Sequence, residues 1–183
     1  MPAGMSRTLS LDLRQQVVSA ARDEGLSHRA AGRLTLYLFD TNIVSADAPA
    51  KGAIGPDTFA AWMRGNADRL FISTVTFVEI EADIARALRI GAPTKGERLR
   101  HWLAAVAHFY AGRILPFGIE EAGHAGAILD RARAHDPGFE DIAIAATAAV
   151  RGLTILTTNE RHFAPLGVPK ANPLEQLPSG SGE

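Results

Sequence analysis

The hydrophobic residues of this sequence fall into short continuous runs and into helically spaced series. Four runs have the length and composition of strands, at residues 36–39, 70–75, 113–117 and 153–158. Between them, apolar residues recur at helical spacing and predict helices over residues 59–63, 78–88, 99–110, 120–135 and 140–152. Apolar strands that alternate with helices are typical of a parallel sheet covered by helices. The pattern therefore predicts an α/β fold.

Composition narrows the class of protein. The chain has 183 residues, of which 46% are hydrophobic, enough for one globular domain with a sizeable core. It has no cysteine, so any metal must be held by oxygen or imidazole. No apolar stretch reaches the roughly 18 to 20 residues that span a bilayer, and the N-terminus has no signal-peptide core. We expect a soluble, cytoplasmic protein that does not contact a membrane. The net charge of −1 means that nucleic-acid binding would need a local basic patch.

Polar residues stand where the predicted strands end and the following helices begin. Asp40 follows the first strand and Asn159 the last, while Glu79 is expected in the first turn of one helix and Asp141 at the start of another. Loops beyond the carboxyl ends of parallel strands meet at one edge of the sheet, so these four residues could share one cleft. The helix that begins at Asp141 is nearly all apolar, which places its acidic start beside an interior crevice.

Each carboxylate also has a purely structural explanation. Asp after a strand is a common helix cap, and acidic residues in a first turn suit the helix dipole. Three carboxylates brought together in a crevice, however, would repel one another and raise one another's pKa unless a cation neutralised them. A hard divalent ion with oxygen ligands, Mg²⁺ or Mn²⁺, is the simplest solution.

The same segments carry a family resemblance. The stretches LYLFDTNIVSA, ISTVTFVEIEADI, EDIAIAATAAVRGLTILTTNERHF and LGVPKANPLEQL together resemble the PIN-domain family, specifically the VapC-type and FitB-like toxins of bacterial toxin–antitoxin pairs. The resemblance covers residues 36–177. It implies a compact three-layer α/β/α sandwich with a central parallel sheet. It also implies a Mg²⁺- or Mn²⁺-dependent endoribonuclease that cleaves RNA and acts as a toxin.

Roles for the site residues follow from the resemblance. Asp40, Glu79 and Asp141 match the acidic core of the family, and Asn159 matches a fourth site where relatives have Asp or Asn. We assign Asp40 and Asp141 as direct metal ligands, with Glu79 acting through a water molecule. A bound divalent ion lowers the pKa of an attacking water and draws charge from the phosphate. Three hydroxyl groups are candidates to support the ligands through hydrogen bonds: Thr41, Ser73 and Thr157.

Several positions depart from the family pattern. Relatives often carry an Asp soon after the third strand, where this chain has Gly118, and an Asp where it has His162. Asn159 supplies no charge. We therefore expect weaker metal binding than in the most acidic relatives, and a preference for Mn²⁺. Glu140 and Glu160 are close enough in sequence to compensate, although either could point to solvent.

Basic residues gather on and after the helix that contains Glu79: Arg86, Arg89, Lys95 and Arg98. Exposed Arg and Lys are usual on a solvated helix face. Beside an acidic cleft they could instead hold RNA phosphates. The resemblance adds a third use, because this two-helix segment often contacts the antitoxin in PIN toxins. It further implies a small cognate antitoxin and a homodimer.

The sequence predicts three parts: a helical extension over residues 1–34, a PIN domain over 35–177 and a disordered tail over 178–183. In the extension, Leu13 and Val17 have helical spacing and Ser27 is a candidate helix cap. Residues 6–33 resemble the opening of a transposase helix-turn-helix domain, truncated before its recognition helix. We expect no direct DNA binding, because the helix that would enter the major groove is absent.

Two other function classes remain open from the sequence. A catalytically weak PIN-fold module would mainly bind an antitoxin and, through it, operator DNA; the uncharged Asn159 favours this alternative. A phosphatase would use Asp40 as its nucleophile. Such sites usually have a second Asp two residues later, where this chain has Asn42.

Overall fold

The computed structural model describes residues 35–46 and 57–178. The expectations for the N-terminal extension, with its helix-turn-helix resemblance, fall outside these ranges. So does nearly all of the expected tail, of which only Pro178 is described: its carbonyl oxygen accepts a hydrogen bond from Trp62 Nε1 at 3.0 Å.

Five parallel strands form the central sheet, in the order β3-β2-β1-β4-β5. Their bounds are β1 Tyr37–Phe39, β2 Leu70–Ser73, β3 Ile114–Leu115, β4 Thr154–Leu156 and β5 Lys170–Ala171. β1 lies at the centre, where Leu38 is in register with Phe71 of β2 and Ile155 of β4. The chain leaves β1 for β2 on one side and later returns to β4 on the other side. The carboxyl ends of β1 and β4 therefore form the switch point at which open parallel sheets bind their ligands.

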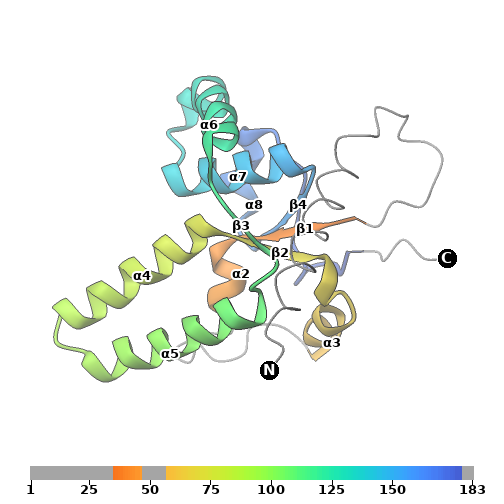
Figure 1. Ribbon diagram of the computed structural model, residues 1–183. Coiled ribbons are helices and arrows are strands. Elements are labelled where there is room, and N and C mark those ends of the chain that lie inside the picture. Colours follow the sequence, from red (N-terminus) through yellow and green to blue (C-terminus); the bar gives the residue numbers. More distant parts are fainter. Residues whose placement is uncertain (1–34, 47–56, 179–183) are drawn as a thin grey trace, which may run out of the picture. The chain divides into compact units, whose positions relative to one another are not determined.

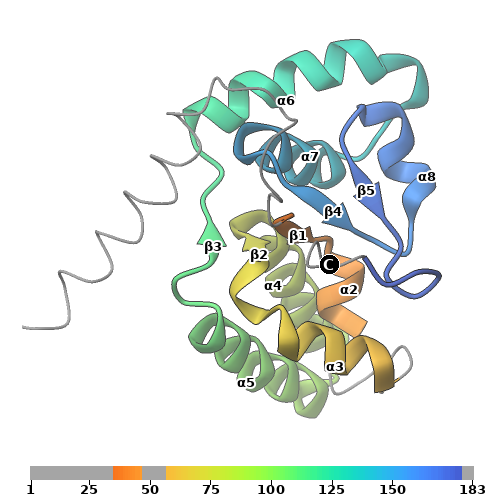
Figure 2. The ribbon, with the colours of Figure 1, turned by 90° about the vertical axis from the view of Figure 1, so that its right-hand side faces the viewer.

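Seven helices are described around this sheet, three of them followed or preceded by short 3₁₀ turns. Their bounds are α2 Thr41–Ala46, α3 Asp57–Gly65, α4 Thr74–Arg89, α5 Pro93–Phe109, α6 Ile119–Ala132, α7 Phe139–Arg151 and α8 Glu160–Phe163. Figures 1 and 2 show α6, α7 and α8 on one side of the sheet, and α2, α3 and α5 on the other. The three-layer arrangement predicted from the sequence is confirmed.

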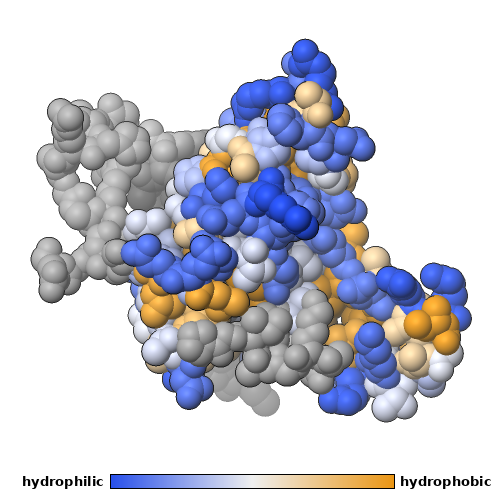
Figure 3. Space-filling view, turned by 180° about the vertical axis from the view of Figure 1, so that it is seen from behind, coloured by the Kyte–Doolittle hydropathy of each residue, from blue (hydrophilic) through white to orange (hydrophobic). Residues whose placement is uncertain are grey.

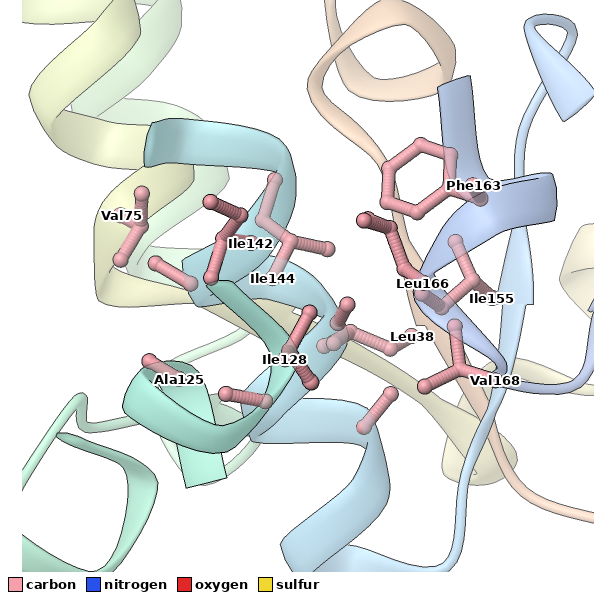
Figure 4. Packing of buried hydrophobic residues seen from close by; sticks show 14 of the residues in the cluster. Leu38, Val75, Ala125, Ile128, Ile142, Ile144, Ile155, Phe163, Leu166 and Val168 are labelled. Atoms are coloured by element: carbon pink, nitrogen blue, oxygen red, sulfur yellow. The ribbon is translucent and has the colours of Figure 1, made fainter. Parts of the chain in front are cut away.

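Alternation along each strand divides the core between the two faces. In β1, Leu38 points to the side of α6 and α7, while Tyr37 and Phe39 point to the opposite side. Ile155 of β4 joins the first of these cores, and Figure 4 shows it with Leu38 against residues of α6, α7 and the segment after α8. Both faces of β1 are dry, which explains why its sequence is continuously apolar.

The pair α4 and α5 forms a hairpin that extends away from the sheet (Figure 1). The two helices share a hydrophobic core, to which Ile80 and Ile84 of α4 and Leu99 of α5 belong. Towards the tip of the hairpin, Ile90 is 63% exposed, and hydrophobic surface is visible over this region at the lower right of Figure 3. Within the described ranges, no helix is long and apolar enough to cross a membrane.

The strands are shorter than predicted, and three elements were not predicted as such. The sequence assigned four to six residues to each of four strands, whereas the structure has two to four in these strands. The two-residue strand β5 lies in a stretch of mixed polarity without a period of two, so the pattern could not reveal it. The short helices α2 and α8 contain too few residues to show a period of 3.6. Gly152, at φ +63°, ends α7 in a left-handed conformation and turns the chain into β4.

A buried carboxylate fixes the start of α6. Glu121 is 2% exposed, and its Oε2 accepts a hydrogen bond from the Gly118 backbone N at 2.9 Å. Its Oε1 accepts from Arg151 at 2.8 Å, which ties α6 to the end of α7. Burial alone would raise the pKa of Glu121, but the hydrogen bonds and the charge of Arg151 outweigh it and lower the pKa. Glu121 therefore stabilises the fold in its ionised form.

We predict that Glu121→Gln lowers the free energy of unfolding at pH 7 by about 2 kcal/mol, because the charge-assisted hydrogen bonds between Arg151 and the Glu121 carboxylate are weakened. A lowered carboxyl pKa stabilises the fold above the unfolded value and loses this effect as the pH falls through the folded value. The difference between wild type and Glu121→Gln, measured by urea unfolding, should therefore shrink at acidic pH. Glu120→Gln is the matched control, since Glu120 is exposed in the same turn. Equal losses in both variants would contradict this role.

Candidate functional site

Asp40 lies directly after the central strand and is 6% exposed. Its backbone N donates to the Leu156 carbonyl at 3.0 Å, which fixes it against the end of β4. Asp40 immediately precedes α2, which begins at Thr41, so it occupies the position of a helix cap. A cap position alone, however, does not require burial at the switch point.

The Asp40 carboxylate is held where its charge is unfavourable. Burial raises the pKa of Asp40, and the charge of Asp141 raises it further, against hydrogen bonds from Thr157 and from the backbone of α2. A raised carboxyl pKa means that stability is lost as the pH rises from the unfolded value through the folded one. At neutral pH, ionised Asp40 therefore destabilises the metal-free fold.

The hydroxyl of Thr157 connects the ends of β1 and β4. It is fully buried and donates to Asp40 Oδ2 at 2.7 Å. It also accepts from Asn42 Nδ2 at 3.2 Å and from the Asn159 backbone N at 2.9 Å. One donated and two accepted bonds use the full capacity of a hydroxyl group. Thr157 thus holds the Asp40 carboxylate by a hydrogen bond, and the amide of Asn42, which was not among the predicted site residues, joins the same network.

Glu79 lies in the second turn of α4, not in the first as predicted. The helix begins at Thr74, immediately after β2, and Ser73 caps it by accepting a hydrogen bond from the Val75 backbone N at 3.2 Å. The predicted start was too late because the sequence pattern could not show that strand and helix are joined without a loop. Ser73 is therefore engaged as a helix cap. The helix dipole does not explain Glu79, which lies beyond the first turn.

Glu79 contributes a second carboxylate with a raised pKa. Burial is the main cause, opposed by a hydrogen bond that the Thr41 hydroxyl donates to Glu79 Oε2. The charges of Asp40, Glu140 and Asp141 raise the pKa of Glu79 further. The Thr41 hydroxyl also lies 3.4 Å from that of the buried Thr76. The charge of Asp141 therefore acts on Asp40, and the charges of Asp40 and Asp141 act on Glu79.

Asp141 enters the site from the first turn of α7. Its side chain is 23% exposed, and its Oδ2 lies 3.1 Å from Nδ1 of His162 on α8. Glu140, next to it, is exposed but close enough for its charge to act on Glu79. His162 entered the sequence analysis only as a departure from the family pattern, so its contact with Asp141 was not predicted.

Asn159 follows β4 as predicted, but its side chain is engaged elsewhere. Its Oδ1 accepts a hydrogen bond from Arg161 Nε at 3.2 Å, and its backbone N donates to Thr157. The contact with Asp141 is made by His162, three residues later. The sequence pattern could not distinguish these positions because both lie on the short segment after β4.

The predicted basic cluster lies along the hairpin. Arg86 and Arg89 are in the last turn of α4, and Lys95 and Arg98 are in α5; all four are exposed. Ten residues of helix separate Glu79 from Arg89, about 15 Å along the axis. These side chains are better placed for a long substrate or a partner than for the group at the carboxylates.

The carboxylate oxygens of the site are ligands of the kind that a hard divalent ion prefers. Within residues 35–46 and 57–178, no group of three or more acidic or histidine side chains has the arrangement that could hold a metal ion. Mg²⁺ is often held by one or two carboxylates together with water molecules. Asp40 and Asp141 are two carboxylates whose charges interact: burial raises the pKa of Asp40 most, and the charge of Asp141 raises it further. A cation beside them would relieve that repulsion.

Comparison with known proteins identifies the family. A model described as the PIN domain matches residues 37–167, well over half of the chain. The chain belongs to the PIN-domain family. PIN domains are generally nucleases that depend on divalent metal ions, which favours a nuclease over the phosphatase alternative. No match was found among curated proteins.

Solved PIN structures agree with this assignment. The structure of FitAcB from Neisseria gonorrhoeae matches with 29% identity and a TM-score of 0.62, over 75% of this chain and 98% of that chain. DNA-bound VapBC from Salmonella typhimurium matches with 27% identity and a TM-score of 0.56, over the same shares. VapBC2 from Rickettsia felis, at 19% identity and a TM-score of 0.59, shows the fold alone; it covers 75% of this chain and 98% of that chain. The predicted VapC-type and FitB-like resemblance is confirmed.

We predict that Thr157→Val lowers the free energy of unfolding at pH 7 by about 1–3 kcal/mol, because buried polar groups lose their partner. The loss also raises the pKa of Asp40 further, so the penalty should diminish at acidic pH, where Asp40 is protonated. Thr157→Ser keeps the hydroxyl and serves as the control. Thermal unfolding of the three proteins at neutral and acidic pH provides the measurement. A Val variant as stable as wild type would show that the hydroxyl does not support the site.

Proposed function

We propose that this chain is a Mg²⁺- or Mn²⁺-dependent endoribonuclease that acts as the toxin of a toxin–antitoxin pair. Membership of the PIN family supports a nuclease, and the similarity to FitAcB and VapBC supports the toxin class. The observation that carries the proposal is the group of mutually repelling carboxylates at the switch point, where burial raises the pKa of both Asp40 and Glu79.

Each residue of the site has a separate role in this proposal. Asp40 and Asp141 would hold the ion, which when bound polarises the phosphate and activates the attacking water. Glu79, with its raised pKa, is suited to accept a proton from that water at neutral pH. Thr157 and Thr41 fix the orientations of Asp40 and Glu79 through the hydrogen bonds described above.

The same comparison supports a proposal about partners. The neighbouring structures include FitAB bound to a DNA fragment and VapBC bound to DNA. We propose that this chain forms a homodimer, pairs with a small antitoxin and reaches DNA only through that antitoxin. The exposed Arg86, Arg89 and Lys95 on the hairpin are candidate contacts for the antitoxin or for distant RNA phosphates.

We predict that purified protein, free of antitoxin, cleaves RNA into discrete fragments in Mn²⁺ or Mg²⁺ and not in EDTA. Asp141→Asn should reduce the rate by at least about 100-fold, because the ion loses a ligand. Asp130→Asn is the matched control: Asp130 is an exposed acid on α6 that pairs only with Arg133 over 3.5 Å among the described salt bridges. Fragment patterns on total RNA would also identify the cut sites.

The same assay decides between the two functions that remain. The catalytically weak binding module is favoured by the engagement of Asn159 with Arg161 and by the limited metal-ligand set within the described ranges. It predicts no cleavage by folded wild-type protein in either metal. Cleavage that persists unchanged in Asp141→Asn would instead remove the site assignment.

A further inference from the structure

His162 is held at the edge of the site by the fold around it. It lies in α8, which begins directly after the segment that follows β4. The next residue, Phe163, is fully buried in the core with Leu166 (Figure 4), and the His162 backbone N donates to the Asn159 carbonyl at 3.1 Å. The backbone at His162 is therefore fixed, although 48% of its side chain remains exposed.

The contact with Asp141 determines the state of the ring. Nδ1 of His162 lies 3.1 Å from Asp141 Oδ2. An ionised carboxylate has no hydrogen to give, so Nδ1 must carry the proton and donate it. In the neutral ring this selects the Nδ1–H tautomer and leaves Nε2 as an acceptor.

Asp141 needs such a partner to face the site. Its side chain starts on the exposed first turn of α7 and is repelled by Asp40, whose pKa its charge raises. Staggered rotamers that turn the carboxylate to solvent would relieve this repulsion. A donor bound to Oδ2 opposes that rotation and leaves Oδ1 available.

We propose that His162 is a positioning residue that holds the Asp141 carboxylate towards Asp40, in the orientation in which the two can share a divalent ion. This rests on the proposed function. His162 supplies a hydrogen-bond donor to Asp141, whereas the Asn159 side chain is engaged with Arg161.

The test compares His162→Ala with His162→Asn, whose side-chain NH₂ can donate from a position near that of Nδ1. Calorimetry with Mn²⁺ alone and RNA-cleavage kinetics provide the readouts. His162→Ala should weaken Mn²⁺ binding and lower kcat by about 10- to 100-fold, with Asn recovering most of both. The melting temperature should hardly change, since exposed pairs contribute little to stability. His124→Ala, at an exposed position on α6, is the control.

The outcomes separate this proposal from the proposed function. Wild type that neither binds Mn²⁺ nor cleaves RNA overturns both. If wild type binds Mn²⁺ and cleaves RNA and His162→Ala does both equally well, only the role of His162 is overturned, and its contact with Asp141 is a surface hydrogen bond without effect on the site. Equal losses in Ala and Asn, together with a lower melting temperature, would show a structural role instead. The ¹⁵N NMR shifts of the His162 ring should show that the Nδ1–H tautomer is favoured in wild type. In Asp141→Ala this tautomer should no longer be favoured.

Discussion

Desolvation of the Asp40 carboxylate at the end of the central strand is the constraint on which the site depends. The strand must be dry on both faces to sit in the middle of the sheet, so the residue that follows it is also largely removed from water. Asp141 and Glu79 then bring two more negative charges towards the same place. Hydrogen bonds from Thr157 and from the start of α2 stabilise the Asp40 charge but do not fully offset burial and repulsion.

Such an arrangement makes sense for a binding site and not for stability alone. Functional sites often retain groups that destabilise the unliganded fold, because the same groups bind the ligand. The structure around the buried Asp40 carboxylate is firmly held. β1 is paired with a strand on each side, and the hydroxyl of Thr157 makes all three of its hydrogen bonds. The first turn of α7 is more exposed, and Asp141 depends on His162 rather than on burial.

The sequence predicted the features that follow from strong periodicity. The predicted strands and the major helices follow from the apolar pattern, and the position of Asp40 follows from the apolar run that it ends. Asp141 was placed by the apolar helix that it begins. Glu79 was predicted in the first turn of its helix but lies in the second. The helix begins earlier than predicted, because nothing in the pattern shows that β2 and α4 are joined without a loop. His162 was missed because a four-residue helix has no detectable period, and its contact with Asp141 spans 21 residues of chain. Thr157 was predicted only as support, since its three hydrogen bonds depend on the register of β1 and β4.

The most direct measurement is the melting temperature of metal-free wild type and of Asp40→Asn at neutral pH, each in EDTA and in Mn²⁺. Asp40→Asn should melt higher than wild type in EDTA, because the desolvated charge is gone. Wild type should gain about 2.7 kcal/mol at 100 times the Kd of Mn²⁺, or about 5–10 °C for a chain of this size, and Asp40→Asn should gain almost nothing. Wild type that is unaffected by Mn²⁺, together with an Asp40→Asn variant that melts lower in EDTA, would contradict the view that this charge is kept for a cation.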